Sequence, residues 1–204
     1  PKPSSAASDV YKRQNLKLIK SFPLDKIQLE KLVHSDIAKE SWHILFSSAE
    51  KMRTTINSPK SQLLKYFESE KYKNQDIIQR ITVEQALSEM NVIQISLAYE
   101  TEEIANNYAK RINNEFEGAF LANMNLNCID ICAKGINKAQ GVKELLNLQK
   151  DKYFEQVLTI GDAQNDVPMI KEFEGYSLNS ATMHAKNVAT KLYDSVGEML
   201  LDNM

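Results

Sequence analysis

The chain is 204 residues long, 43% of them hydrophobic, and its formal net charge at pH 7 is −2. This length suits one large domain or two small ones, and the near-neutral charge argues against nucleic acid or an acidic membrane surface as a partner. The sequence has neither a signal-peptide pattern nor the roughly 18 consecutive apolar residues that span a bilayer, so we expect a soluble, cytoplasmic protein, of unspecified oligomeric state.

The first fourteen residues do not resemble part of a folded protein. Residues 4–14 are the in-frame translation of a string that resembles a transposase-type sequencing adapter. We therefore expect residues 1–14 to be an adapter-derived artefact, disordered and fused to a gene whose start was lost. A natural, disordered Ser/Ala-rich leader is the alternative, and long-read sequencing of the source locus distinguishes the two.

Strand and helix patterns alternate between residues 15 and 135. The predicted elements are a strand over 16–22, a helix opened by Asp25, a strand over 42–46, a helix begun by Pro59, a strand over 92–98, a helix capped by Thr101, and strands over 119–123 and 127–133. The strand over 92–98 has the clearest signal, because apolar Ile93, Ile95 and Leu97 alternate with polar residues. This mixture predicts an α+β domain over residues 15–135.

Three of the predicted helices carry apolar stripes that we expect to face a core. In the helix opened by Asp25 the stripe consists of Leu29, Leu32, Val33 and Ile37. In the helix capped by Thr101 the stripe consists of Ile104, Tyr108 and Ile112. In a helix predicted over 138–149 it consists of Val142, Leu145 and Leu146.

The most informative segment is 157–170. Three of its first four residues are apolar, the exception being Thr159, which is typical of a strand buried on both faces in a parallel sheet. Gly161 then allows a turn, Asp162 stands at the predicted strand end, and Asn165 or Asp166 can cap the following helix. Ligands of open α/β sheets bind beyond the carboxyl ends of the strands. Two carboxylates and an amide there can supply oxygen ligands for Mg²⁺ and a donor for an anion, whereas turn and capping chemistry alone is the alternative.

Three segments together resemble the haloacid dehalogenase superfamily of phosphohydrolases. Segment 157–170 is similar to the fourth motif of its Cof-type branch, GD-x-x-ND-x-x-M. Residues 134–142 resemble the third motif of that branch, and 175–181 resemble its strand followed by an Asn-x-Ala loop. Another short strand is expected over 176–178, followed by helical patterns over 181–191 and 196–201. The resemblance is specific over residues 127–204 and architectural before them.

The resemblance implies a role for each of five residues. Asp162 would coordinate Mg²⁺, and Asp166 would hold the loop and contribute to the metal site. Lys138 and Asn165 would contact the substrate phosphate, although a solvated lysine is the alternative for Lys138. Asn179 would support the site without touching the substrate. A metal ion and an ammonium group suit phosphoryl transfer, because they neutralise the charge of the transferring group.

The resemblance also implies the architecture and the activity. The fold would be α/β, with the C-terminal half of a Rossmann-like core over 136–204 and an inserted α+β cap of the C2 type over 15–135. The function would be Mg²⁺-dependent hydrolysis of phosphate monoesters of small metabolites, such as sugar phosphates. No D-x-D motif, which supplies the nucleophile in this family, occurs in the sequence, so we expect a fragment that is inactive as written. A related phosphotransferase such as a phosphohexomutase, or a non-enzymatic phosphate-binding domain, remain as alternatives.

Overall fold

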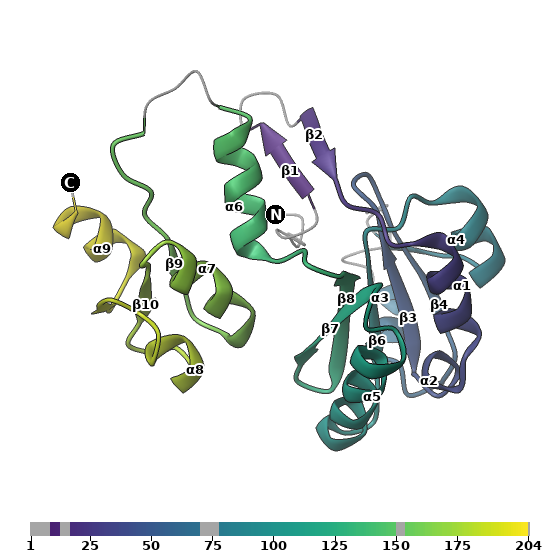
Figure 1. Ribbon diagram of the computed structural model, residues 1–204. Coiled ribbons are helices and arrows are strands. Elements are labelled where there is room, and N and C mark those ends of the chain that lie inside the picture. Colours follow the sequence, from purple (N-terminus) through teal and green to yellow (C-terminus); the bar gives the residue numbers. More distant parts are fainter. Residues whose placement is uncertain (1–8, 13–16, 70–77, 150–153, 204) are drawn as a thin grey trace. The chain divides into compact units, whose positions relative to one another are not determined.

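The structure is a computed structural model that describes residues 9–12, 17–69, 78–149 and 154–203 (Figure 1). The chain divides into two compact units. We call Tyr11–Gly135 the six-stranded unit, and Ile136–Met204, to which Pro1–Val10 are also assigned, the three-stranded unit. The division follows Gly135, which has a φ of 80°, a conformation that favours glycine. None of the helices in the described part of the chain is long and apolar enough to cross a membrane.

The six-stranded unit is built on one mixed sheet with the strand order β5-β4-β3-β6-β8-β7. All neighbouring strands are antiparallel except β4 and β5, which are parallel. The strands are β3 (His43–Ser47), β4 (Met52–Ile56), β5 (Ile78–Arg80), β6 (Gln94–Ala98), β7 (Phe120–Asn125) and β8 (Cys128–Ala133). The helices are α1 (Lys26–His34), α2 (Asp36–Lys39), α3 (Leu63–Glu68), α4 (Val83–Glu89) and α5 (Glu102–Glu115).

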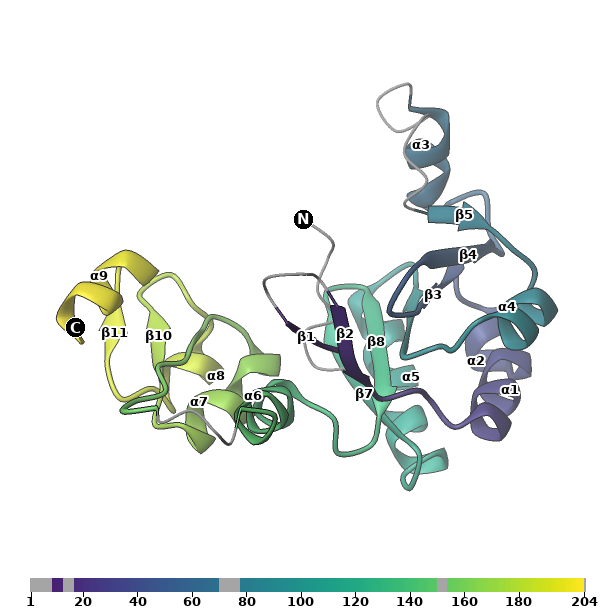
Figure 2. The same cartoon turned by 90° about the horizontal axis from the view of Figure 1, so that it is seen from above.

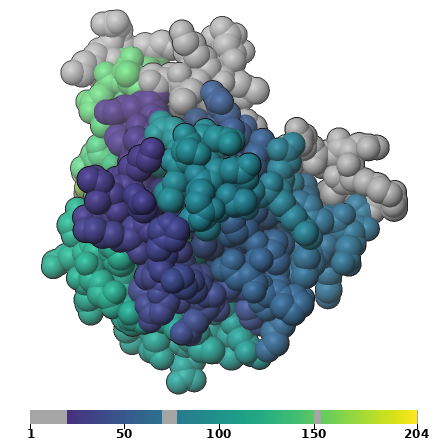
Figure 3. Space-filling model, turned by 90° about the vertical axis from the view of Figure 1, so that its right-hand side faces the viewer, coloured from purple at the N-terminus to yellow at the C-terminus, as the bar shows by residue number. Residues whose placement is uncertain are grey.

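The core of this unit lies between the sheet and the helices α1, α2, α4 and α5 (Figure 2). Phe46 of β3 is opposite Ile95 of β6, which is in turn opposite Ile131 of β8, and all three are completely buried. The predicted alternation over 92–98 is confirmed, since Ile93, Ile95 and Leu97 are each 0% exposed. On the face covered by helices, two segments far apart in sequence lie side by side, namely the purple α1 region and the teal α4 region (Figure 3).

Helix α5 begins as predicted, but it buries a different stripe. The Thr101 hydroxyl accepts a hydrogen bond from the backbone N–H of Ile104 at 3.2 Å, which is the expected N-cap. The buried residues, however, are Ala105, Ala109 and Ile112, and Ile104 is 38% exposed. The prediction for Ile104 was therefore wrong. Two alanines on one face let the helix pack closely on the sheet, which turns the larger Ile104 side chain outward.

Asn113 of α5 reaches the backbone of the edge strand β7. Its Nδ2 donates to the carbonyl of Ala122 at 3.0 Å, and the Ala122 N–H donates to its Oδ1 at 2.9 Å. The side-chain amide therefore pairs with this residue as a neighbouring strand would. The hairpin between β7 and β8 turns at Leu126, which has a φ of 55°.

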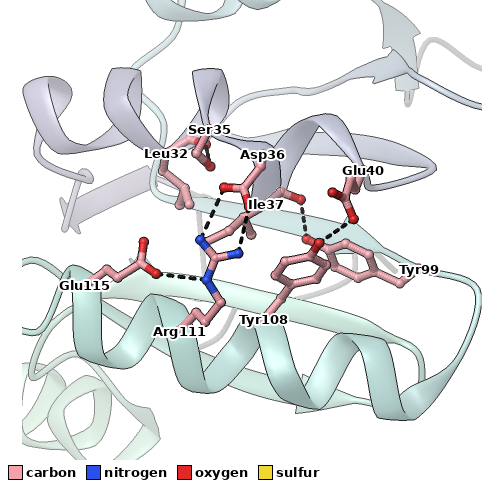
Figure 4. A network of polar contacts seen from close by, with 9 residues as sticks. All are labelled: Leu32, Ser35, Asp36, Ile37, Glu40, Tyr99, Tyr108, Arg111 and Glu115. Carbon is pink, nitrogen blue, oxygen red and sulfur yellow. Dashed lines mark hydrogen bonds and ion pairs between the residues drawn. The ribbon is translucent and has the colours of Figure 1, made fainter.

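A network of polar contacts joins α2 to α5 on the surface (Figure 4). Arg111 donates to both carboxylate oxygens of Asp36, at 2.7 and 3.2 Å, and to Glu115 at 2.8 Å. The Tyr108 hydroxyl donates to Glu40, and this hydrogen bond, together with burial, raises the pKa of Tyr108 to about 12. These charged side chains are about half exposed, so they orient the two helices but add little stability.

The predicted elements around residues 50–90 were incomplete. Pro59 lies in a turn, and α3 begins only at Leu63, where the Ser61 hydroxyl accepts a hydrogen bond from the Leu63 N–H at 3.3 Å. No residue of α3 is buried. Strands β4 and β5 and helix α4 were not predicted. Helix α1, in contrast, begins as expected, with Asp25 accepting from the Gln28 N–H at 2.9 Å.

Near the N-terminus, β1 (Asp9–Lys12) and β2 (Lys17–Ser21) form a two-stranded sheet. The strand predicted over 16–22 is thus present as β2. Residues 9–12 were expected to be disordered, and that expectation fails for them because Val10 and Tyr11, both residues that favour strands, lie in β1. The rest of the 1–14 segment lies outside the described residues.

The three-stranded unit has a parallel sheet in the order β11-β10-β9. Its elements are α6 (Lys138–Asn147), β9 (Ile160–Gly161), the 3₁₀ helix η1 (Gln164–Asp166), α7 (Val167–Glu172), β10 (Tyr176–Leu178), α8 (Met183–Lys186), β11 (Leu192–Tyr193) and α9 (Val196–Asp202). The parallel α/β arrangement and the strand over 176–178 are confirmed.

Two predictions for this unit need correction. The strand expected over 157–160 is shorter and lies at the sheet edge, because β10 is the only described strand that pairs with β9. In α6 only Ala139 is buried, and Leu145, which was expected to face a core, is 36% exposed. Both differences follow from a sheet of three short strands, which covers little apolar surface.

Candidate functional site

The loop between β9 and α7 folds back tightly on itself. Asp162 directly follows β9, and Asp166 ends the 3₁₀ helix η1 and is only 2% exposed. A Cβ atom placed on Gly161 would lie 2.3 Å from the Cβ of Asp166. Gly161 is therefore required because the Asp166 side chain occupies that space.

Asp166 is the centre of the loop's hydrogen bonds. Its Oδ2 accepts from the backbone N–H groups of Asp162 at 3.0 Å and Ala163 at 3.1 Å, and its Oδ1 accepts from Nζ of Lys138. Burial alone would raise the pKa of this carboxyl, but the hydrogen bonds from Lys138 and from the backbone outweigh burial and lower it. Asp166 is thus an ionised group that ties the loop to α6.

Lys138 is placed by the start of helix α6. The preceding residue, Asn137, is the N-cap, and its side chain accepts from the Gln140 N–H at 3.0 Å. Lys138 is the first residue of the helix, and its side chain remains 31% exposed although it is paired with Asp166. An ammonium group has three N–H donors, so an anion in solvent can still reach this one.

The Asp162 carboxylate contrasts with that of Asp166. It is exposed, and it accepts no hydrogen bond or ion pair from any side chain or backbone group in the described ranges. Its backbone is held firmly, since the Asp162 carbonyl accepts from Thr182 N–H at 2.9 Å and Thr182 Oγ1 at 3.2 Å. The Ser177 hydroxyl donates to the preceding carbonyl, that of Gly161, at 2.7 Å.

Thr182 and Ser177 were not identified from the sequence. Ser177 is the central residue of β10 and completely buried, and Thr182 is the N-cap of α8. A lone hydroxyl in the middle of a predicted buried strand is a signal for Ser177. No local pattern points to Thr182, because its partner lies twenty residues earlier.

The structure brings three of the five predicted site residues together, namely Lys138, Asp162 and Asp166. Asn165 lies in the same loop and is exposed to solvent. Asn179 follows β10, and its Nδ2 donates to Asp194 at 2.6 Å, a contact that does not involve the other four residues.

The donor set bears on whether this loop can hold Mg²⁺. No group of three or more His, Cys, Asp or Glu side chains suited to a metal ion occurs among the described residues. Mg²⁺ nevertheless often binds through one or two carboxylates, completing its shell with water and phosphate oxygens. The exposed Asp162 fits such a role. Asp166 fits it poorly, because both of its oxygens already accept hydrogen bonds.

Comparisons with known proteins agree on one family. The family model for haloacid dehalogenase-like hydrolases matches residues 9–198. A haloacid dehalogenase-like hydrolase from Bacteroides thetaiotaomicron is 18% identical, with a TM-score of 0.69, over 94% of this chain and 71% of that one. A protein from Plasmodium vivax described as a HAD/COF-like hydrolase is 17% identical, with a TM-score of 0.70, over 92% of this chain and 64% of that one.

A third solved structure is that of a sugar phosphatase of HAD subclass IIB, 16% identical with a TM-score of 0.71, over 92% of this chain and 70% of that one. Identities this low show a shared fold alone. The chain spans 64–71% of the length of these three proteins, and no curated protein matches it. The family model covers most of the chain and confirms the resemblance found in the sequence. The chain belongs to the haloacid dehalogenase-like hydrolases.

Proposed function

We propose that the chain is part of a Mg²⁺-dependent phosphatase that hydrolyses phosphate monoesters of small metabolites, such as sugar phosphates. The observation that carries this proposal is the loop in which buried Asp166 holds Lys138 next to the backbone of Asp162. An exposed carboxylate and an accessible ammonium are thereby fixed on one framework. A fold shared with a sugar phosphatase supports the choice of substrate class.

Each residue has a distinct role in this proposal. The Asp162 carboxylate holds Mg²⁺, which when bound supplies positive charge against the phosphoryl oxygens. The Lys138 ammonium binds and orients the phosphate, and the exposed Asn165 amide donates to it. Asp166 keeps the lysine and the loop in place and is not assigned to the metal. Asn179 supports the loop after β10 through Asp194.

We also assign the two units to different tasks. The three-stranded unit, with its parallel sheet and the loop after β9, is proposed to belong to the catalytic core. The six-stranded unit is proposed to be the cap that selects the substrate. The position of the loop beyond the carboxyl end of a parallel strand supports the first assignment.

Phosphate binding without hydrolysis is the second candidate. The observation that favours it is the lack of a D-x-D motif in the 204 residues, since a covalent mechanism needs a nucleophile.

Titration of the protein with inorganic phosphate, with and without Mg²⁺, tests the site by calorimetry. We expect Lys138→Met to weaken phosphate binding by about tenfold or more, equivalent to about 1.4 kcal/mol, and Asp162→Asn to remove the effect of Mg²⁺. Lys143→Met is the matched control, because Lys143 also lies on α6, is 43% exposed and pairs with Glu172 instead. If Lys143→Met and Lys138→Met weaken phosphate binding equally, the proposed site is wrong.

Turnover of p-nitrophenyl phosphate tests for the phosphatase. Because a fragment without the nucleophile motif is expected to be inactive, phosphate binding that depends on Lys138 without turnover supports the site but fits both candidates. Metal-dependent turnover that Asp162→Asn abolishes favours the phosphatase.

A further inference from the structure

The Thr182 hydroxyl does not make the contact that its position in the chain favours. Thr182 is the N-cap of α8, where a threonine oxygen usually accepts a hydrogen bond from an N–H of the first helical turn. No such bond is formed. Instead Oγ1 donates backward to the carbonyl of Asp162 at 3.2 Å, the same oxygen that the Thr182 N–H reaches at 2.9 Å.

This contact completes the immobilisation of the Asp162 backbone. The Asp162 N–H donates to Oδ2 of Asp166 at 3.0 Å, so both polar backbone groups of residue 162 are held by other parts of the unit. Holding both groups restrains φ and ψ and therefore the direction of the Cα–Cβ bond. The Asp162 carboxylate itself is exposed, so its orientation depends on this restraint.

We propose that Thr182 is a positioning residue, which fixes the backbone of Asp162 so that the carboxylate keeps one orientation toward a divalent cation. The inference rests on the proposed function, in which Asp162 holds Mg²⁺. Ser177 assists by holding the carbonyl of Gly161, one peptide earlier, at 2.7 Å. Thr182 itself need not touch metal or substrate. Groups that support a metal ligand in this way commonly change metal affinity about tenfold or more when removed.

Ser195 provides a matched control in the same unit. It is the N-cap of α9, and its hydroxyl accepts from the Glu198 N–H at 3.1 Å, which is the ordinary capping contact. Ser195→Ala therefore removes one hydroxyl hydrogen bond at a helix start without touching Asp162. Both substitutions cost one hydrogen bond, but only that at Thr182 lies beside the site.

The experiment measures the dissociation constant of Mg²⁺ alone, by calorimetry on the full chain, together with the unfolding temperature. We expect Thr182→Val to raise the dissociation constant about tenfold, whereas Thr182→Ser, which keeps the hydroxyl, should bind Mg²⁺ as tightly as the unchanged protein. Ser195→Ala should leave the dissociation constant unchanged, although it should lower the unfolding temperature about as much as Thr182→Val does. If the valine variant does not fold, Thr182→Ala is compared with Thr182→Ser in its place.

Failure of this inference is distinguishable from failure of the proposed function. If Asp162→Asn abolishes Mg²⁺ binding and the Thr182 variants bind as tightly as the unchanged protein, only the positioning role is wrong. The positioning role is also wrong if Ser195→Ala weakens binding as much as Thr182→Val. If Asp162→Asn leaves Mg²⁺ binding unchanged, the proposed function fails, and the positioning role fails with it.

Discussion

The two units differ in the interactions that stabilise each of them internally. In the six-stranded unit a continuous apolar cluster fills the space between the sheet and the helices. In the described part of the three-stranded unit the buried apolar side chains are Ala139, Ile170, Ala185, Tyr193 and Met199. Three polar side chains are buried beside them, those of Thr159, Asp166 and Ser177. Eight of the twelve exposed large hydrophobic side chains found in the described residues also lie in this unit.

The difference shows where each unit can tolerate change. Burial of apolar surface is not directional, so the six-stranded unit depends on the volume of its core side chains. The three-stranded unit depends on directional contacts around a few atoms, chiefly the carboxylate of Asp166 and the backbone of Asp162. The proposed site thus lies in the unit whose shape depends most on hydrogen bonds.

The largest expected effect comes from opening a cavity in the six-stranded unit. Phe46→Ala removes a completely buried ring from β3 and should lower the free energy of unfolding by about 3–5 kcal/mol. The only tryptophan, Trp42, lies in this unit, so urea unfolding followed by its fluorescence reports on the unit directly. Ile27→Ala is the control, because Ile27 is 66% exposed. The urea midpoint of this variant should be nearly the same as that of the unchanged protein. Equal effects of the two substitutions would contradict the core described above.

Acid should affect the six-stranded unit first. His43 is 7% exposed, its Nδ1 lies 2.9 Å from the Ser61 hydroxyl, and burial lowers its pKa from 6.5 to about 4. Because the unfolded chain takes up this proton at a higher pH, the contribution of neutral His43 is complete above about pH 6.5 and is lost as the pH falls toward 4. The free energy of unfolding should thereby fall by about 3 kcal/mol. Asp166 also has a lowered pKa, but its contribution is lost only at pH values below the usual carboxyl range.

Urea unfolding at pH 7 and at pH 4.5, followed by Trp42 fluorescence, measures this effect. His43→Gln should reduce the difference in the free energy of unfolding between the two pH values. His34→Gln changes an exposed position and should leave that difference as it is in the unchanged protein. A dependence that is unaltered in His43→Gln would assign the acid sensitivity to other groups.

A smaller effect, confined to the three-stranded unit, is expected from Gly161→Ala. The added Cβ would lie 2.3 Å from Cβ of Asp166, so the loop must shift, at a cost of about 1–3 kcal/mol. Hydrogen exchange should increase in the peptides covering residues 160–167, while the fluorescence transition of Trp42 stays in place. Gly118→Ala is the control, since a Cβ there meets nothing within 4 Å. Unchanged exchange in Gly161→Ala would show that the loop is looser than described.

The sequence predicted those elements whose signal is local. Alternation at Ile93, Ile95 and Leu97 was sufficient for β6, and the side chains of Asp25 and Thr101 marked two helix starts. Strand β4 has no such signal, because its sequence MRTTI is mostly polar and its Thr54 is buried by pairing with β3. Helix α4 could have been found, since Thr82 and Gln85 form a capping box.

The candidate site also combines local and non-local features. Gly161, Asp162, Asn165 and Asp166 lie within six residues, so their motif could be read directly. The contact between Lys138 and Asp166 spans 28 residues, and only the family resemblance suggested that the two lie near each other. The contact between Thr182 and Asp162 requires the loop after β10 to return to β9, and no local pattern encodes this tertiary contact.

The pairing of Asn113 with Ala122 has a consequence for association between copies of the protein. Strand β7 ends the six-stranded sheet, and the free side of such a strand is a template on which another chain can add a strand and begin to aggregate. At Ala122 both backbone groups that would receive such a strand are occupied by the Asn113 amide. An incoming strand would have to displace the Asn113 side chain from these groups. We therefore expect Asn113 to hinder edge-to-edge association of the sheet at this position.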